Sequence, residues 1–311
     1  MKLNDYIKDN TLCAKFGIKY LDDKLEGILQ GDLILLGARS GAGKSTIADI
    51  IATHNAQNGV KVTLISLENF EGDNFIAKAY YKYKESIKDH NLTIRKFASG
   101  QFKANAEALR IAEDYANKQY ENVHLINRRK DYTIDNLFDD IVGAVCKESS
   151  QLVVIDHIDY LDKTDNESEI AHITKLIKTI RNAQYVYKVP VIAISHLRKP
   201  TNQRDNVIVP SVDEFIGSSN KVKESTCVIM LAPDEEDNLQ NMDNLKSTWC
   251  CIRKLRMGGV DNKAARIYFD TKTGNYKPNY DVFKVNYSGT KVEEIIPSGA
   301  YGVKSKCTKS Y

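Results

Sequence analysis

The feature that most constrains this chain is a short apolar segment that runs into a glycine-rich loop. The apolar segment covers residues 33–36, and a stretch of helical character, residues 47–55, follows the loop. The loop reads Gly37-Ala38-Arg39-Ser40-Gly41-Ala42-Gly43-Lys44-Ser45-Thr46. Glycines allow backbone N–H groups to turn inward, and the start of a helix adds a partial positive charge. A buried strand, this loop and a helix together predict a site for the phosphates of a nucleoside triphosphate.

Individual residues of the loop also suggest roles. Lys44 would reach the β- and γ-phosphates, and the Ser45 hydroxyl would be a ligand of Mg²⁺. The pattern G-x-x-x-x-G-K-[ST] has glycine where this chain has Ala38, which is a mild departure. A surface loop with a chance lysine is the alternative, and the flanking strand and helix argue against it. The predicted ATP-binding residues of the loop are Ala38, Arg39, Ser40, Gly41, Ala42, Gly43, Lys44, Ser45 and Thr46.

Composition narrows the class of protein. With 311 residues, 42% of them hydrophobic, the chain can form a sizeable core. Its net charge of +3 gives no overall basic field, so any nucleic-acid site must be local. The six cysteines form no C-x-x-C pair, so we expect free thiols rather than zinc ligands. The sequence has no signal-peptide core and no membrane-length apolar run, so we expect a cytoplasmic protein without a membrane partner.

The order of strands and helices predicts an α/β fold. Apolar, β-branched segments alternate with helical patterns, and they lie at 33–36, 61–68, 152–156 and 190–195. This alternation favours a mostly parallel, twisted sheet flanked by helices, a P-loop NTPase core. Beyond Ser225 strands follow one another without helices, so the sheet should end in antiparallel strands.

We expect three parts in the chain. They are an amino-terminal arm at 1–16, one domain at 17–287 and a weakly ordered basic tail at 288–311. The acidic segment 234–237 would be a solvated loop within the domain.

Three side chains at strand ends could complete the chemistry. Asp156 ends an apolar strand, at the edge where open α/β sheets bind ligands, and suits an acid that holds Mg²⁺. Glu68 ends the strand after the phosphate-loop helix and could act as the general base for water. An acid that begins a helix is an equal alternative for Glu68. His196 could contact the γ-phosphate or could simply be hydrogen-bonded.

The strongest local basic patch follows His196. Arg198, Lys199 and Arg204 lie in a polar stretch that could follow the phosphate backbone of single-stranded DNA. A solvated surface loop is the open alternative.

Several motifs, in this order and spacing, resemble one family. They are Gly37-Ala38-Arg39, Gly43-Lys44-Ser45, Ser66-Leu67-Glu68, Val154-Ile155-Asp156-His157-Ile158, Ile194-Ser195-His196-Leu197, Lys254-Leu255-Arg256-Met257-Gly258 and Phe269-Asp270-Thr271-Lys272-Thr273-Gly274. From about Phe16 to Pro278 the chain is similar to the helicase domain of DnaB-type ring helicases. It is most similar to the helicase half of phage primase–helicases. The family has a RecA-like core.

The resemblance implies an ATP- and Mg²⁺-dependent replicative DNA helicase that hydrolyses ATP to translocate on single-stranded DNA. It also implies a ring, usually a homo-hexamer, with a separate primase or loader as a further partner. Glu68 then becomes the catalytic base. Arg256 becomes an arginine finger that enters the neighbouring subunit's site, with help from Lys254. By the same resemblance, Phe269 would lie against the nucleotide base.

Two departures from the family pattern concern the machinery that couples ATP to DNA. The usual Asp-Leu-Arg-x-Ser-Gly segment stands here as residues 214–219 without its arginine, and Lys223 stands where glutamine is usual. Two other classes of protein share such a core, a RecA-type strand-exchange or regulatory ATPase and an ATP-binding helicase loader. The presence of both Glu68 and Arg256 argues against a loader that does not hydrolyse ATP.

Overall fold

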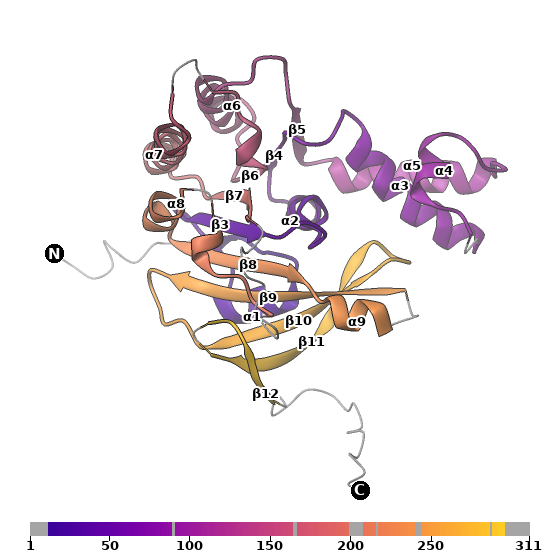
Figure 1. Ribbon diagram of the computed structural model, residues 1–311. Helices are drawn as coiled ribbons and strands as arrows, with labels where there is room; N and C mark the ends of the chain where they lie inside the picture. Colours follow the sequence, from indigo (N-terminus) through magenta and orange to yellow (C-terminus); the bar gives the residue numbers. More distant parts are fainter. Residues whose placement is uncertain are drawn as a thin grey trace, which may run out of the picture.

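A ten-stranded sheet forms the centre of the protein (Figure 1). The computed structural model describes residues 12–88, 91–163, 167–198, 208–215, 217–240, 244–286 and 288–295. The strand order is β12-β11-β10-β9-β8-β3-β7-β6-β4-β5. Neighbouring strands are parallel from β8 to β5 and antiparallel from β8 to β12. The predicted fold class, a mostly parallel sheet with an antiparallel carboxyl-terminal edge, is confirmed.

The elements have the following bounds. The strands of the sheet are β3 (Leu33–Ala38), β4 (Val62–Ser66), β5 (Val123–Asn127), β6 (Leu152–Asp156), β7 (Val191–His196), β8 (Cys227–Pro233), β9 (Leu245–Leu255), β10 (Lys263–Asp270), β11 (Asn275–Val285) and β12 (Lys291–Ile295). The helices are α1 (Lys19–Leu25), α2 (Lys44–Gln57), α3 (Asp73–Ile87), α4 (Ile94–Ala98), α5 (Ala106–Tyr120), α6 (Ile134–Cys146), α7 (Glu169–Tyr187), α8 (Ser218–Glu224) and α9 (Glu235–Gln240). Short 3₁₀ turns are η2 (Ile158–Tyr160) and η3 (Val212–Glu214).

The parallel strands are buried on both faces. In β3, Ile34 and Leu36 pack with residues of α1 and α2, whereas Leu33 and Leu35 pack with residues of α6 and α7. All four side chains are fully buried. Because successive residues of a strand point to opposite faces, strands covered on both sides need apolar residues at nearly every position. The polar side chains of this region are therefore displaced to the loops at the strand ends.

Helices α3, α4 and α5 form a unit beyond the β5 edge of the sheet (Figure 1). The unit has a small core of its own, in which Tyr80 and Tyr83 are buried. It is tied to α2 through Asp49, whose carboxylate pairs with the Lys78 Nζ at 2.9 Å and accepts a hydrogen bond from the Tyr120 hydroxyl.

The ends of the chain differ from expectation where they are described. Strand β12 pairs with β11, so the predicted boundary at 287 was wrong and the sheet continues to Ile295. At the other end, β1 (Leu12–Ala14) pairs with β2 (Ile28–Leu29), and Phe16 is fully buried, so residues 12–16 belong to the domain. Residues 1–11 of the predicted arm and 296–311 of the predicted tail lie outside the described residues.

The acidic segment at 234–237 was also predicted wrongly as a solvated loop. Asp234 is buried, and its Oδ2 accepts a hydrogen bond from the Arg266 Nε at 2.7 Å. Helix α9 begins at Glu235, directly after it. The ion pair to a strand 32 residues away, rather than solvation, is what the aspartate provides.

Within the parts of the chain that the structure describes, no helix is both long enough and apolar enough to cross a membrane.

Candidate nucleotide site

The phosphate loop joins β3 to α2 as the sequence predicts. Gly41 and Gly43 have φ values of +82° and +80°, a backbone conformation that glycine adopts at little cost. Helix α2 has Gly43 at its N-cap, with no side-chain cap and no acidic residue in its first turn. A Cβ added to Gly41 would meet nothing within 4 Å. The positive end of α2 therefore faces open space that an anion can enter.

Ala38 departs from the usual loop pattern without harm to the geometry. It is the last residue of β3, it is 0% exposed, and its side chain belongs to the core on the α2 face. Its φ is not among the positive values, so the position does not need glycine. An alanine methyl group fills the space as a core residue would.

Lys44, Ser45 and Asp156 lie together at the carboxyl edge of the sheet. Lys44 is 8% exposed, and burial lowers its pKa despite the opposing charges of Glu68 and Asp156. Asp156 is 1% exposed, and burial raises its pKa even though the Ser45 hydroxyl hydrogen-bonds to it. A phosphate beside Lys44 and a cation beside Asp156 would each stabilise the charged form of a buried group.

The donor set also suits Mg²⁺. The Oδ1 atom of Asp156 is buried and has no hydrogen-bond partner, which is costly for a carboxylate oxygen. Mg²⁺ prefers oxygen ligands and keeps much of its water shell, so one carboxylate and one hydroxyl suffice beside the phosphates. Ser45 and Asp156 therefore fit the predicted ion.

Glu68 lies beside two histidines at the same edge. The Glu68 Oε2 lies 3.6 Å from the His157 Nε2, and the His157 ring meets the His196 ring edge to face, with centroids 4.0 Å apart. The Glu68 side chain is 38% exposed, so solvent reaches it. Burial lowers the pKa of His196, and the nearby His157 and Lys44 lower it further. Donor atoms of Glu68, His157 and His196 lie within 4.8 Å of one another, an arrangement that a transition-metal ion could use.

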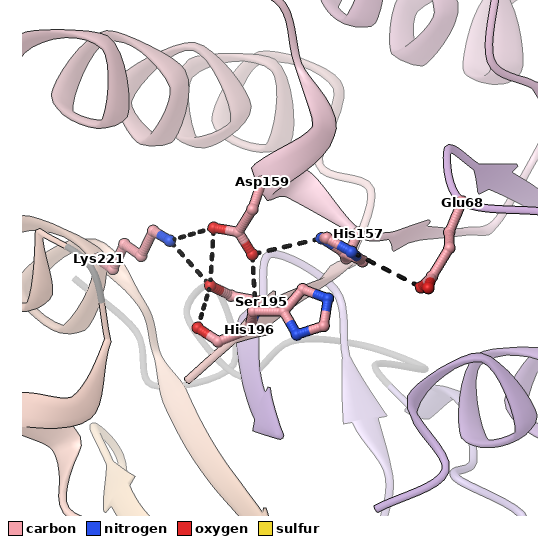
Figure 2. A network of polar contacts seen from close by, with 6 residues as sticks. All are labelled: Glu68, His157, Asp159, Ser195, His196 and Lys221. Atoms are coloured by element: carbon pink, nitrogen blue, oxygen red, sulfur yellow. Dashed lines mark hydrogen bonds and ion pairs between the residues drawn. The ribbon is translucent and has the colours of Figure 1, made fainter. Parts of the chain in front are cut away.

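Behind the histidines lies a buried polar network that the sequence did not reveal (Figure 2). Asp159 Oδ2 accepts the backbone N–H of His196 at 2.7 Å and lies 3.4 Å from the His157 Nδ1. Asp159 Oδ1 pairs with the Lys221 Nζ at 2.7 Å and accepts the Ser195 hydroxyl at 3.1 Å. Burial alone would raise the pKa of Asp159, but the hydrogen bond from His157 and the charge of Lys221 together lower it. Asp159 is thus held as a carboxylate.

Arg256 and Lys254 lie at the opposite edge of the sheet from Lys44. Cys227, which begins β8, pairs with Ile34 near the start of β3 and with Leu255 at the end of β9. Lys44 follows the other end of β3. At about 3.3 Å per residue, the strand alone separates the two edges by roughly 16 Å. The finger residue therefore does not reach the phosphate loop of its own chain.

Phe269 lies behind another aromatic residue. It is 8% exposed, and its ring contacts those of Tyr276 and Tyr81, with centroids 5.5 and 6.1 Å away. The Tyr276 hydroxyl lies 3.7 Å from where a Cβ on Gly43 would stand. Tyr276, which the sequence analysis did not single out, is thus the aromatic residue nearest the phosphate loop among these three.

The predicted DNA-binding residues are described only in part. Lys199 and Arg204 lie outside the described residues. Arg198 is exposed, with its Nη2 3.9 Å from the Glu169 Oε2. The base of this loop is closed by a bridge between Leu197 and Phe215.

The residues that sequence reasoning missed share one signal. Asp159 and Ser195 are polar and lie within three residues of a predicted strand end, where ligand sites form in such sheets. His157 follows Asp156 directly and was quoted in a motif without a role. Lys221 carried no such signal, because its partner is 62 residues away and it reads as one of two surface lysines, with Lys223.

A phosphate loop, a buried acid on a neighbouring strand and a glutamate beside them define a P-loop ATPase site. A family model for the DnaB-like helicase C-terminal domain matches residues 14–278. The chain belongs to this family. The predicted recognition, helicase function and ATP hydrolysis are therefore confirmed at the level of the family, which supports neither the strand-exchange nor the loader alternative.

Solved structures give the same fold. The ATPase domain of a phage helicase has a TM-score of 0.70 and 18% identity, over 88% of this chain and 94% of that one. A DnaB-like replicative helicase, described with its interactions with primase, has a TM-score of 0.69 and 18% identity. The match covers 88% of this chain and 64% of that one, so the chain spans less than two thirds of that helicase. KaiC-like protein PH0186 from Pyrococcus horikoshii has a TM-score of 0.55 and 16% identity, over 84% and 97%. Curated protein sequences give no significant match.

Proposed function

We propose that this chain is a motor subunit that couples hydrolysis of Mg²⁺-bound ATP to movement along single-stranded DNA within a ring, a homo-hexamer. The observation that carries the proposal is the separation of Lys44 and Arg256 across the sheet. Each chain offers a phosphate loop at one edge and an arginine at the other. A neighbour that presents its Arg256 edge to this chain's loop completes the site.

The Arg256 edge has the charge for that role. Burial and then the nearby Arg256 lower the pKa values of both Arg181 and Lys254, so three cations gather there. A cleft of about 350 Å³, lined by Arg181 and Arg256 among others, opens at the same edge. A cluster of cations that raise one another's free energy favours an anion, such as the triphosphate in the next subunit.

The side chains of the loop edge would divide the chemistry among them. The N–H groups at the start of α2 and Lys44 bind the phosphates, and Glu68 orients a water and takes its proton as the water attacks the γ-phosphorus. The bond from that phosphorus to the β,γ-bridging oxygen then breaks. Mg²⁺, held by Ser45 and Asp156, would neutralise charge on the phosphate oxygens. His196 lies where it can contact the γ-phosphate, and Tyr276 and Phe269 lie on the base side of the loop.

The contacts to other molecules follow from the loops. Arg198, Lys199 and Arg204 would bind the backbone of single-stranded DNA. The helicase named in one similar structure is described with primase. We propose a separate primase or loader as a partner here too, with the protein acting in the cytoplasm, or in the host cytoplasm if a phage encodes it.

One experiment tests the proposal as a whole. ATP turnover is measured with and without single-stranded DNA, beside a fork-unwinding assay and the mass of the protein in solution with ATP present. We expect DNA to stimulate turnover, unwinding of the fork and a mass near six chains. DNA-independent turnover by a monomer would contradict the proposal.

A further inference from the structure

Helix α8 lies between the two edges that the proposed function needs. Its Lys221 points toward the nucleotide edge, where Asp159, Ser195 and His196 meet (Figure 2). Its carboxyl-terminal carbonyl groups meet β9 at the finger edge. The helix has only seven residues, so a displacement at one end moves the other.

The contact with the nucleotide edge is buried and charged. The Lys221 side chain is 0% exposed, and its Nζ lies 2.7 Å from the Asp159 Oδ1 and 2.8 Å from the Ser195 Oγ. Asp159 binds the backbone N–H of His196 with its other oxygen and lies beside His157, which faces Glu68. A buried charge pair with this many partners holds one geometry, because any loss of contact leaves a charge unpaired.

The contact with the finger edge uses backbone carbonyls. The Lys254 Nζ donates hydrogen bonds to the carbonyl oxygens of Val222, Lys223 and Ser225, and the Arg256 Nη2 donates to that of Lys223 at 3.0 Å. Val222 and Lys223 directly follow Lys221. The residue anchored at the nucleotide edge and those that hold the finger segment are therefore consecutive.

We propose that Lys221 is a positioning residue that makes α8 a link between each chain's own nucleotide site and the arginine finger it gives to its neighbour. The proposal rests on the proposed function, because it needs Arg256 to act on the next subunit. A change at the γ-phosphate that shifts His196 or His157 moves Asp159, and Lys221 carries the shift to the carbonyl groups that hold Lys254 and Arg256. Lys221 touches no substrate in this scheme.

Mixed rings separate the two ends of the link. Lys44→Ala subunits retain the finger but not the phosphate loop, and Arg256→Ala subunits retain the loop but not the finger, so their mixture should hydrolyse ATP where the two meet. Lys221→Met is then added to one kind of subunit at a time. On the Arg256→Ala subunit it reports on the chain's own site, and on the Lys44→Ala subunit it reports on the finger alone.

We expect Lys221→Met to lower the turnover of the mixture about tenfold or more in either position, since a catalytic group misplaced by about 1 Å can cost ~100-fold in rate. Lys178→Met, a change at an exposed lysine of the neighbouring α7, serves as the matched control and should have no effect in either position. Ring mass and thermal unfolding are measured for every variant.

Because Lys221→Met leaves the Asp159 carboxylate buried without its cation, the double variant Lys221→Met with Asp159→Asn is tested as well. It removes both charges and should fold, yet it should give the same loss in both positions because the link is absent.

Each result decides the matter. Loss in both positions from folded, assembled rings supports the link. Loss only on the Arg256→Ala subunit, or in neither position, overturns it and leaves the finger in place. An inactive parent mixture contradicts the finger from the neighbour, and with it the link.

Discussion

The guanidinium group of Arg39 binds both carboxylate oxygens of Glu214, with its Nε and Nη2 at 3.0 and 2.8 Å. The two residues are 175 positions apart. Arg39 belongs to the phosphate loop, and Glu214 ends the turn that follows the basic loop. A Cβ added to Gly37 would lie 2.4 Å from the Phe215 ring, so the next residue also rests on the phosphate-loop strand. The base of the basic loop is thus fastened to the nucleotide site.

Glu214→Gln should weaken the effect of DNA on ATP turnover. The amide keeps the shape but removes the charge that holds the Arg39 fork. We expect the ratio of DNA-stimulated to basal turnover to fall about fivefold or more, the usual scale of coupling between sites. Glu113→Gln, at an exposed acid of α5, is the control. A ratio equal to that of the unmodified protein would show that this ion pair carries no coupling.

Asp156→Asn should raise the Mg²⁺ concentration needed for turnover by about tenfold or more, since the buried Oδ1 loses its negative charge. Binding of ATP without Mg²⁺ should persist, because the loop and Lys44 remain. A Mg²⁺ titration of turnover measures the shift, with Asp139→Asn on the exposed face of α6 as control. If the titration curve does not move, Asp156 is a structural residue.

Glu68→Gln should separate binding from chemistry. The change removes the base but keeps the side chain beside His157, so ATP should bind while turnover falls roughly 100-fold or more. Nucleotide binding by fluorescence titration and steady-state turnover together test this. A parallel loss of binding would assign Glu68 to the metal or to the fold instead.

Lys199→Ala with Arg204→Ala should weaken binding to single-stranded DNA and reduce its dependence on salt. Two lost phosphate contacts lower the slope of log K against log salt by about 1.4, at about 0.7 for each contact with a single strand. Turnover without DNA should stay near its original level. An unaltered slope would place the DNA on another surface.

The parallel half of the fold could be predicted because its signals are local. Strands buried on both faces, such as β3, are continuous apolar runs, and the phosphate loop keeps the spacing that its geometry needs. The antiparallel strands β11 and β12 escaped prediction because they are half exposed and charged, with Lys277, Asp281 and Lys284 on β11 alone. Such strands owe their place to pairing with β10, which no local pattern shows.

The site divides in the same way. Lys44, Ser45, Asp156 and Glu68 could be placed because each follows a strand end that the sequence shows. The pairs that hold the site together could not. Lys221 with Asp159, Arg39 with Glu214 and Arg266 with Asp234 each join residues more than 30 positions apart. A charged residue in a polar stretch reads as solvated until the fold brings its partner near.

The most direct test of the account concerns Lys44 and Arg256, which act in the same reaction but on different subunits. Alone, Lys44→Ala should lose most ATP binding, and Arg256→Ala should lose about 10³- to 10⁵-fold in turnover while it still binds ATP. In an equimolar mixture, about a quarter of the interfaces in a ring pair an intact loop with an intact finger.

Turnover of the mixture is therefore the decisive measurement. The account predicts that the mixture recovers up to about a quarter of the activity of unmodified rings, by the same count of interfaces. Recovery should grow with protein concentration as rings assemble. A mixture as inactive as its two components, in protein that has assembled and folded, would contradict a finger supplied by the neighbour.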